Sequence, residues 1–167
     1  NLPVGFLGLR LGATLAFLTA ADRRGPAPRF IALWEPVVSG RDYVDQELRK
    51  KLMKEMVTFG KSRSSRASLV QSLGEGHDVD FDGYSLTARL FRELCDIDLI
   101  GSTAPILDKQ PVLVAHVSPQ GRPPRPLTAL RDTLERHGAE CSLIAVPGQP
   151  FWNLIGLVDA GDLIRQT

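Results

Sequence analysis

The chain has 167 residues, 43% of them hydrophobic, and a formal net charge of +1 at pH 7. This length suits one domain with a sizeable core, and the charge alone indicates neither nucleic-acid binding nor attraction to an acidic membrane surface. No apolar stretch reaches the roughly 18 residues of a membrane span. The only cysteines, Cys95 and Cys141, are far apart and make no disulfide framework. We therefore expect a reducing, cytoplasmic setting.

Four short apolar runs predict buried strands, at residues 4–8, 30–34, 111–117 and 141–146. Helical periodicity or composition predicts helices at residues 11–21, 43–59, 86–94 and 127–134, with a short terminal helix after residue 151. Ser85 is the expected N-cap of the third helix. Strands that are apolar throughout and alternate with helices are typical of α/β folds. We predict a mostly parallel sheet of about four strands, in chain order, with helices on both faces.

Residues 61–83 have the weakest pattern. They begin with the basic, polar stretch KSRSSR, which we interpret as a solvated loop. We expect this segment to be a cap-like insert and the least ordered part of the chain, because it has few apolar anchors. Asp78, Asp80 and Asp82 alternate like the start of a calcium loop, but the position of its closing glutamate is Arg89. We therefore predict no metal site, and no cofactor is indicated.

The stretch FLGLRLGATLA contains glycine, arginine and glycine at alternate positions: Gly8, Arg10 and Gly12. This is the spacing of a nucleophile elbow, G-x-S-x-G, with arginine in place of serine. An elbow lifts one side chain above the carboxyl end of a strand, and flanking glycines relieve the crowding of its backbone. Arginine is no nucleophile, but its guanidinium offers a fork of donors to a carboxylate or phosphate. The alternative is an ordinary strand-to-helix turn with an exposed arginine.

Three stretches together, GLRLGATLA, ALWEPVVSGRDYVDQELR and VPGQPFW, resemble the α/β-hydrolase superfamily. Within it, the chain looks most like the second hydrolase associated with exosortase A systems, which accompany bacterial surface-protein sorting and exopolysaccharide loci. The resemblance covers nearly the whole chain, and arginine at the elbow is usual in that group. It implies a partial α/β-hydrolase fold, and an activity on an ester or other acyl bond.

The other catalytic positions of an α/β hydrolase do not match. The acid and the histidine should follow later strands. The strand at 111–117 ends near His116 and Ser118 without a carboxylate, and the last strand is followed by Gln149 rather than histidine. His116 is interpreted as a strand-end or core histidine. Trp152 is expected to be core or pocket wall. The catalytic residues are therefore unassigned.

The resemblance also implies that residues 1–167 form one domain without the strands that precede the elbow in a full α/β hydrolase. The first strand would then be a bare apolar edge, which invites pairing. We expect a homodimer, or a separate N-terminal half, to cover it. No nucleic-acid partner and no membrane span are expected.

Two functions remain open. One is hydrolysis of an ester or other acyl bond. The other is non-catalytic binding of an anionic or acyl ligand, or of a protein partner, in the former active-site crevice, at the strand ends where open α/β sheets bind ligands. The candidate crevice residues are Arg10, Leu11, Glu35, His116, Ser118 and Trp152. A charged pair between Arg10 and Glu35 is also predicted, because both stand at the ends of adjacent strands.

Overall fold

The structure is a computed structural model that describes residues 4–22, 27–62, 64–81, 83–101, 109–154, 156 and 159–167. The chain forms two compact units. The first combines Asn1–Val38 with Leu99–Thr167, and the second is Ser39–Asp98. The predicted insert at 61–83 therefore falls inside a larger unit.

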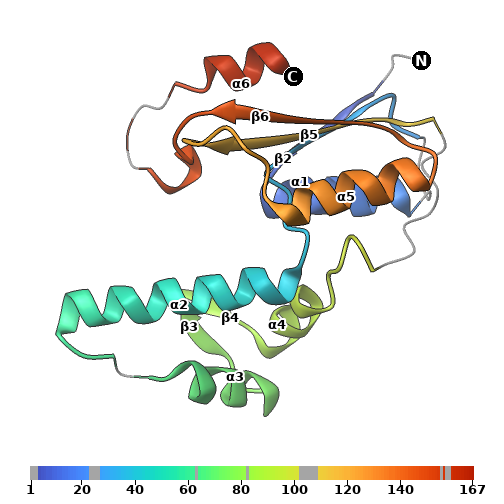
Figure 1. Cartoon of the computed structure of the whole chain (residues 1–167). Helices are drawn as coiled ribbons and strands as arrows, with labels where there is room; N and C mark the ends of the chain where they lie inside the picture. The colour runs from blue at the N-terminus through green and yellow to red at the C-terminus, as the bar shows by residue number, and fades with distance from the viewer. Residues whose placement is uncertain are drawn as a thin grey trace. The chain divides into compact units, whose positions relative to one another are not determined.

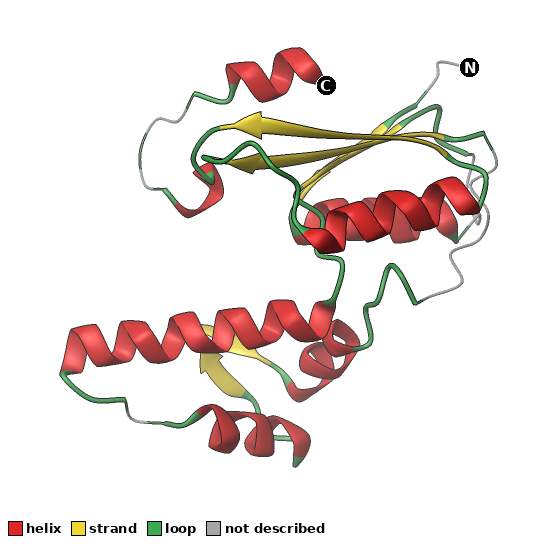
Figure 2. Ribbon diagram, in the orientation of Figure 1, coloured by secondary structure: helices red, strands yellow, loops and turns green. Residues whose placement is uncertain are grey.

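The first unit is built on a four-stranded parallel sheet (Figures 1 and 2). Its strands are β1 (Phe6–Leu9), β2 (Ile31–Trp34), β5 (Pro111–Ser118) and β6 (Glu140–Pro147), in the order β1-β2-β5-β6. This confirms the predicted parallel sheet, its four strands and their sequential order. The strands are mostly apolar because helices pack against the sheet, although β5 and β6 also contain His116, Ser118, Glu140 and Ser142.

Helices α1 (Leu11–Ala21) and α5 (Arg125–Arg136) lie on one face of this sheet, and α6 (Gly161–Gln166) lies on the other (Figure 1). Each step from one strand to the next runs in the same direction across the sheet. Right-handed crossovers in one direction place their helices on one face. The opposite face therefore depends on the C-terminal segment for its cover.

That C-terminal cover is a small apolar cluster. Leu163 of α6 packs with Ala115, Val117 and Val146, and the short 3-10 helix η1 (Phe151–Asn153) adds two aromatic rings beside them. Trp34 Nε1 donates a hydrogen bond to Thr167 Oγ1 at 3.0 Å. These contacts attach the end of the chain to the carboxyl half of the sheet.

The second unit contains three helices and a hairpin: α2 (Gly40–Phe59), α3 (Arg66–Gly74), β3 (Val79–Phe81), β4 (Tyr84–Leu86) and α4 (Ala88–Cys95). The sequence pattern was too weak to predict α3 and the hairpin. Ser65 and Ser68 form a capping box that begins α3. The expectation that Ser85 begins the third helix was wrong, because Ser85 pairs within the hairpin and Thr87 Oγ1 caps α4 by accepting from Leu90 N.

The two ends of the second unit run side by side. Ser39 and Asp98 form an isolated antiparallel bridge, and Gly40 N donates to Ile97 O at 2.8 Å. Position 40 requires glycine because a Cβ there would lie 1.7 Å from Leu94 O. No helix in the described part of the chain has the length and apolarity needed to cross a bilayer.

Candidate functional site

Arg10 occupies a strained turn between β1 and α1. Its backbone angles are φ 55 and ψ −126, which a residue with a side chain rarely adopts. The turn is held on both sides, because Arg10 N donates to Trp34 O at 2.8 Å and Arg10 O accepts from Ala13 N at 3.0 Å. Such strain costs on the order of 1–3 kcal/mol and tends to cluster at functional sites. The prediction of a tight strand-to-helix turn at Arg10 is confirmed.

Only one of the two flanking glycines is sterically required. A Cβ on Gly8 would lie 2.4 Å from Gly12 O and 2.5 Å from the backbone of Ala13, so the first turn of α1 approaches too closely for any side chain. A Cβ on Gly12 would meet nothing within 4 Å. The expectation that crowding requires both glycines was therefore wrong for Gly12.

Glu35 stands beside Arg10 at the end of the neighbouring strand and is strained in the same way. Leu9 pairs with Trp34 in the sheet register, so the next residues, Arg10 and Glu35, leave adjacent strands at the same level. Glu35 has φ 49. Among the described residues, three that are not glycine have a positive φ, and two of them are these neighbours. Backbone strain is thus concentrated at the carboxyl end of the sheet.

The carboxylate of Glu35 is buried and engages β5. Its Oε1 accepts a hydrogen bond from Val117 N at 2.6 Å and lies 2.7 Å from His116 Nδ1. The imidazole contact is an ion pair when the ring is protonated, but the ring N–H is poorly aligned for a hydrogen bond to that oxygen. We predicted that Glu35 would pair with Arg10. In the structure its described charged contact is with His116 instead.

The guanidinium of Arg10 lies over an aromatic ring instead. Its central carbon is 5.6 Å from the centroid of the Trp152 ring, and Phe151 meets Trp152 edge to face, with the centroids 5.2 Å apart. A cation over an indole face gains roughly 0.5–2 kcal/mol. The structure thus brings together two of the predicted crevice residues, one at the elbow and one after β6.

The electrostatic setting of Arg10 is unusual. It is the N-cap of α1, whose first turn contains no acidic residue. The N-terminus of a helix carries a partial positive charge, so a cation there is unfavourable by roughly 0.3–1 kcal/mol. The first N–H groups of a helix also lack intrahelical partners. This end of α1 is therefore suited to an anion.

Thr14 ties the elbow to the segment after β2, and the sequence reading missed it. Its buried hydroxyl donates to Val37 O and accepts from Val37 N, both at 2.8 Å. The sequence signal that could have indicated this bond is a threonine within the alanine-rich first turns of α1. The bond fixes the first turns of α1 relative to the segment that carries Glu35.

The remaining candidate residues have smaller roles. Leu11 is the first residue of α1 and is partly buried. Ser118 Oγ is buried and has no hydrogen-bond partner among the described residues. The backbone oxygen of Ser118 accepts from Gly121 N and Gly148 N. Ser118 therefore lies at the C-terminal end of β5, and none of these contacts gives it a chemical role.

The described residues contain no group of three or more His, Cys, Asp or Glu side chains placed to hold a metal ion. Asp78 has a structural contact, because its carboxylate accepts from Ala88 N at the start of α4. Both thiols are poor nucleophiles. Burial raises the pKa of Cys141 to about 12, with a further contribution from Glu135, and burial also raises the pKa of Cys95.

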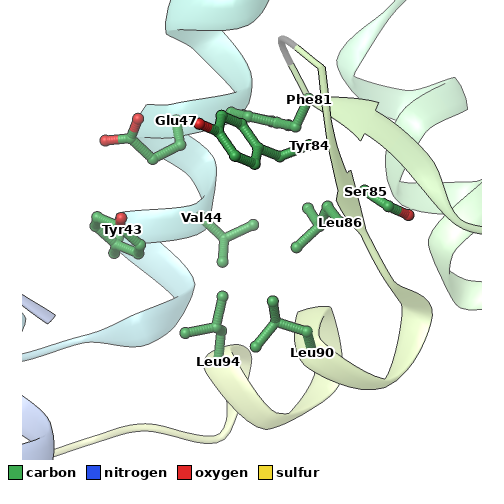
Figure 3. A pocket seen from close by; sticks show the side chains of 9 residues that line it. All are labelled: Tyr43, Val44, Glu47, Phe81, Tyr84, Ser85, Leu86, Leu90 and Leu94. Carbon is green, nitrogen blue, oxygen red and sulfur yellow. The ribbon is translucent and has the colours of Figure 1, made fainter.

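The second unit has an apolar pocket of about 190 Å³ between α2, the hairpin and α4 (Figure 3). Figure 3 shows that four aliphatic side chains converge on it: Val44, Leu86, Leu90 and Leu94. Its other lining residues are Tyr43, Glu47, Phe81, Tyr84 and Ser85. The pocket suits a small apolar group, because its wall is mostly apolar.

The chain matches none of the known protein-family models, and no curated protein sequence matches it.

Proposed function

We propose that this chain is a non-catalytic relative of the α/β hydrolases, and that Arg10 binds a carboxylate or another small anionic group at the former position of the nucleophile. The resemblance to hydrolases associated with exosortase A systems suggests a bacterial, cytoplasmic protein whose ligand carries an acyl chain. The observation that carries the proposal is the conformation of Arg10, φ 55 and ψ −126, at the N-terminus of α1.

Arg10 is unfavourable for stability in two ways. Its backbone is strained, and it places a cationic residue at the N-cap of a helix, whose N-terminus carries a partial positive charge. A bound anion would reverse the second effect, because the guanidinium fork and the N–H groups of Leu11 and Gly12, the first two residues of α1, would then face one ligand. The Trp152 ring beneath the guanidinium supplies an apolar wall for an attached chain.

Tryptophan fluorescence tests this directly. Trp34→Phe leaves Trp152 as the remaining tryptophan, since the chain has two. Titration of this variant with octanoate should change its emission, because the carboxylate draws the guanidinium away from the ring. Octanol, which lacks the charge, should have little effect. Arg10→Gln should abolish the octanoate response, whereas Arg89→Gln, at an exposed arginine of α4, should keep it. An equal response to octanol, or one that survives Arg10→Gln, would contradict the proposal.

Hydrolysis is the second candidate, and the buried Glu35–His116 pair favours it, because a carboxylate beside an imidazole is part of a hydrolase triad. The elbow nevertheless carries no nucleophile. We expect no serine to react with a fluorophosphonate probe. We also expect Arg10→Ser to gain no robust esterase activity, since β2 lies between β1, which ends at the elbow, and β5, which carries His116. Stable labelling of a serine in the unaltered chain would establish hydrolysis.

A further inference from the structure

The C-terminal half of α2 presents apolar side chains outward. Met53, Met56 and Val57, which we call the outer stripe, are 69%, 53% and 86% exposed. They are spaced by three and four residues, so they lie on one side of the helix. Single exposed apolar residues are ordinary, but a row of three on one helix face is not.

The inner side of the same half-helix is polar. Val44 and Leu48 fill the core side of the first half of α2. Farther along, that side carries Lys51 and Glu55, whose side chains are only 10% and 13% exposed and form an ion pair of 3.1 Å. Lys51 Nζ also lies 5.9 Å from the centre of the Phe81 ring. The usual arrangement of a surface helix, apolar inside and polar outside, is therefore reversed over this half of α2.

Basic residues border the outer stripe. Residues 49–66 contain seven Lys or Arg residues and one acidic residue, Glu55. The exposed members are Arg49, Lys50, Lys54, Lys61 and Arg66. Lys50 and Lys54 are one turn apart on the flank of the stripe. Lys50 and Arg66 are paired with Glu47 and Asp45 of α2. Residues 45–66 still hold seven basic residues against three acidic ones, so the net charge around the stripe is positive.

We propose that this end of α2 is a peripheral membrane-binding element, which inserts the outer stripe at the interface of a bilayer that contains anionic lipids. Helices with an apolar face and a Lys- and Arg-rich polar face bind in this way, by apolar burial combined with attraction to the lipid headgroups. Lysine is depleted in protein–protein interfaces, so a rim of Lys50, Lys54 and Lys61 favours a lipid surface over a protein partner. The inference is independent of the ligand proposed at Arg10.

Co-sedimentation of the full chain with vesicles tests the proposal. The chain should bind vesicles of phosphatidylcholine with about one third phosphatidylglycerol, and should not bind pure phosphatidylcholine. Raised salt should release it. Lys50→Gln combined with Lys54→Gln should weaken binding about 25-fold, since each charge contributes about fivefold. Met53→Ser combined with Val57→Ser should weaken it at least about tenfold by removing apolar insertion.

Two matched controls keep the test specific. Arg89→Gln removes one positive charge from an exposed arginine of α4, and Ile164→Ser removes one exposed apolar side chain from α6; both should bind like the unaltered chain. Circular dichroism would verify that each variant is folded, and either double variant suffices for the test.

Three outcomes would overturn the proposal. The first is failure to bind anionic vesicles. The second is equally tight binding to soluble polyglutamate, which would indicate an acidic polypeptide partner. The third is self-association without vesicles that is lost when the outer stripe is made polar, which would indicate a second copy of the chain.

Discussion

The two faces of the main sheet differ in how completely they are covered. On the face packed by α1 and α5, Ile31, Leu33 and Val114 are fully buried. On the opposite face, Leu7 and Phe30 are 55% and 49% exposed, and a groove of about 650 Å³ lies beside the end of α6. The helices of the crossover connections cover the first face, whereas the six residues of α6 provide much of the cover of the second. The difference indicates that the covered face contributes more to stability than the open face.

The largest expected effect is a loss of stability when a buried side chain on the covered face is shortened. Leu33→Ala should lower the free energy of unfolding by about 2–5 kcal/mol, because it leaves a cavity among side chains that cannot collapse onto it. Leu7→Ala, the same change on the open face, should cost less than about 1 kcal/mol. Urea unfolding of the two variants measures both values. Similar losses would mean that the open face is as important to stability as the covered one.

The next effect concerns the elbow. Gly8→Ala should cost about 1–3 kcal/mol, because its methyl group would displace the first turn of α1. Gly12→Ala is the matched control. It should be neutral or stabilising by up to about 1 kcal/mol, since the position is open and helical. Thermal unfolding distinguishes the two changes, and equal losses would show that Gly12 is also constrained.

A change in assembly should follow from the open edge. β1 is an edge strand, and Val4 and Leu7 are more than half exposed. We expect the chain to be a homodimer at micromolar concentration in light scattering. Leu7→Lys should convert it to a monomer with little loss of stability, because charged residues block pairing at an edge. A monomeric unaltered chain would contradict this prediction.

The smallest effect is chemical. Cys141 lies on β6 with its pKa raised to about 12 by burial, so its thiol is almost fully protonated at pH 8. Ellman's reagent should modify it at least about a hundredfold more slowly in the folded chain than in urea. Because the folded state favours the protonated thiol, this contribution to stability is complete below pH ~8.5 and is lost as the pH rises toward about 12. Unchanged reactivity in urea would contradict the burial of this thiol.

The sequence predicted the main sheet well, because apolar runs bounded by glycine, proline or charged residues carry a strong local signal. It failed for residues 66–86, where α3 and the hairpin begin from polar side chains such as Ser65 and depend on contacts with other elements. Propensity is weak for short elements of this kind, and tertiary contacts decide them.

The site was predicted in part. The position and strain of Arg10 follow from the spacing of its neighbours, which is a local property of the chain. The partner of Glu35 does not, because His116 lies on a strand 81 residues later and the side chain of Glu35 can turn to either adjacent strand. Contacts between residues far apart in the sequence are hard to predict in this way, since strand register and side-chain direction are fixed only when the sheet forms.

The side-by-side exit and re-entry of the chain around residues 39–98 has a consequence for how such proteins diversify. Leu99 N donates to Val38 O at 2.9 Å, so residues 39–98 leave and re-enter the sheet-bearing unit at adjacent positions. A segment attached in this way can be lengthened, shortened or exchanged for another without altering the register of β2 and β5. One scaffold can thus acquire different accessory modules while its elbow is preserved.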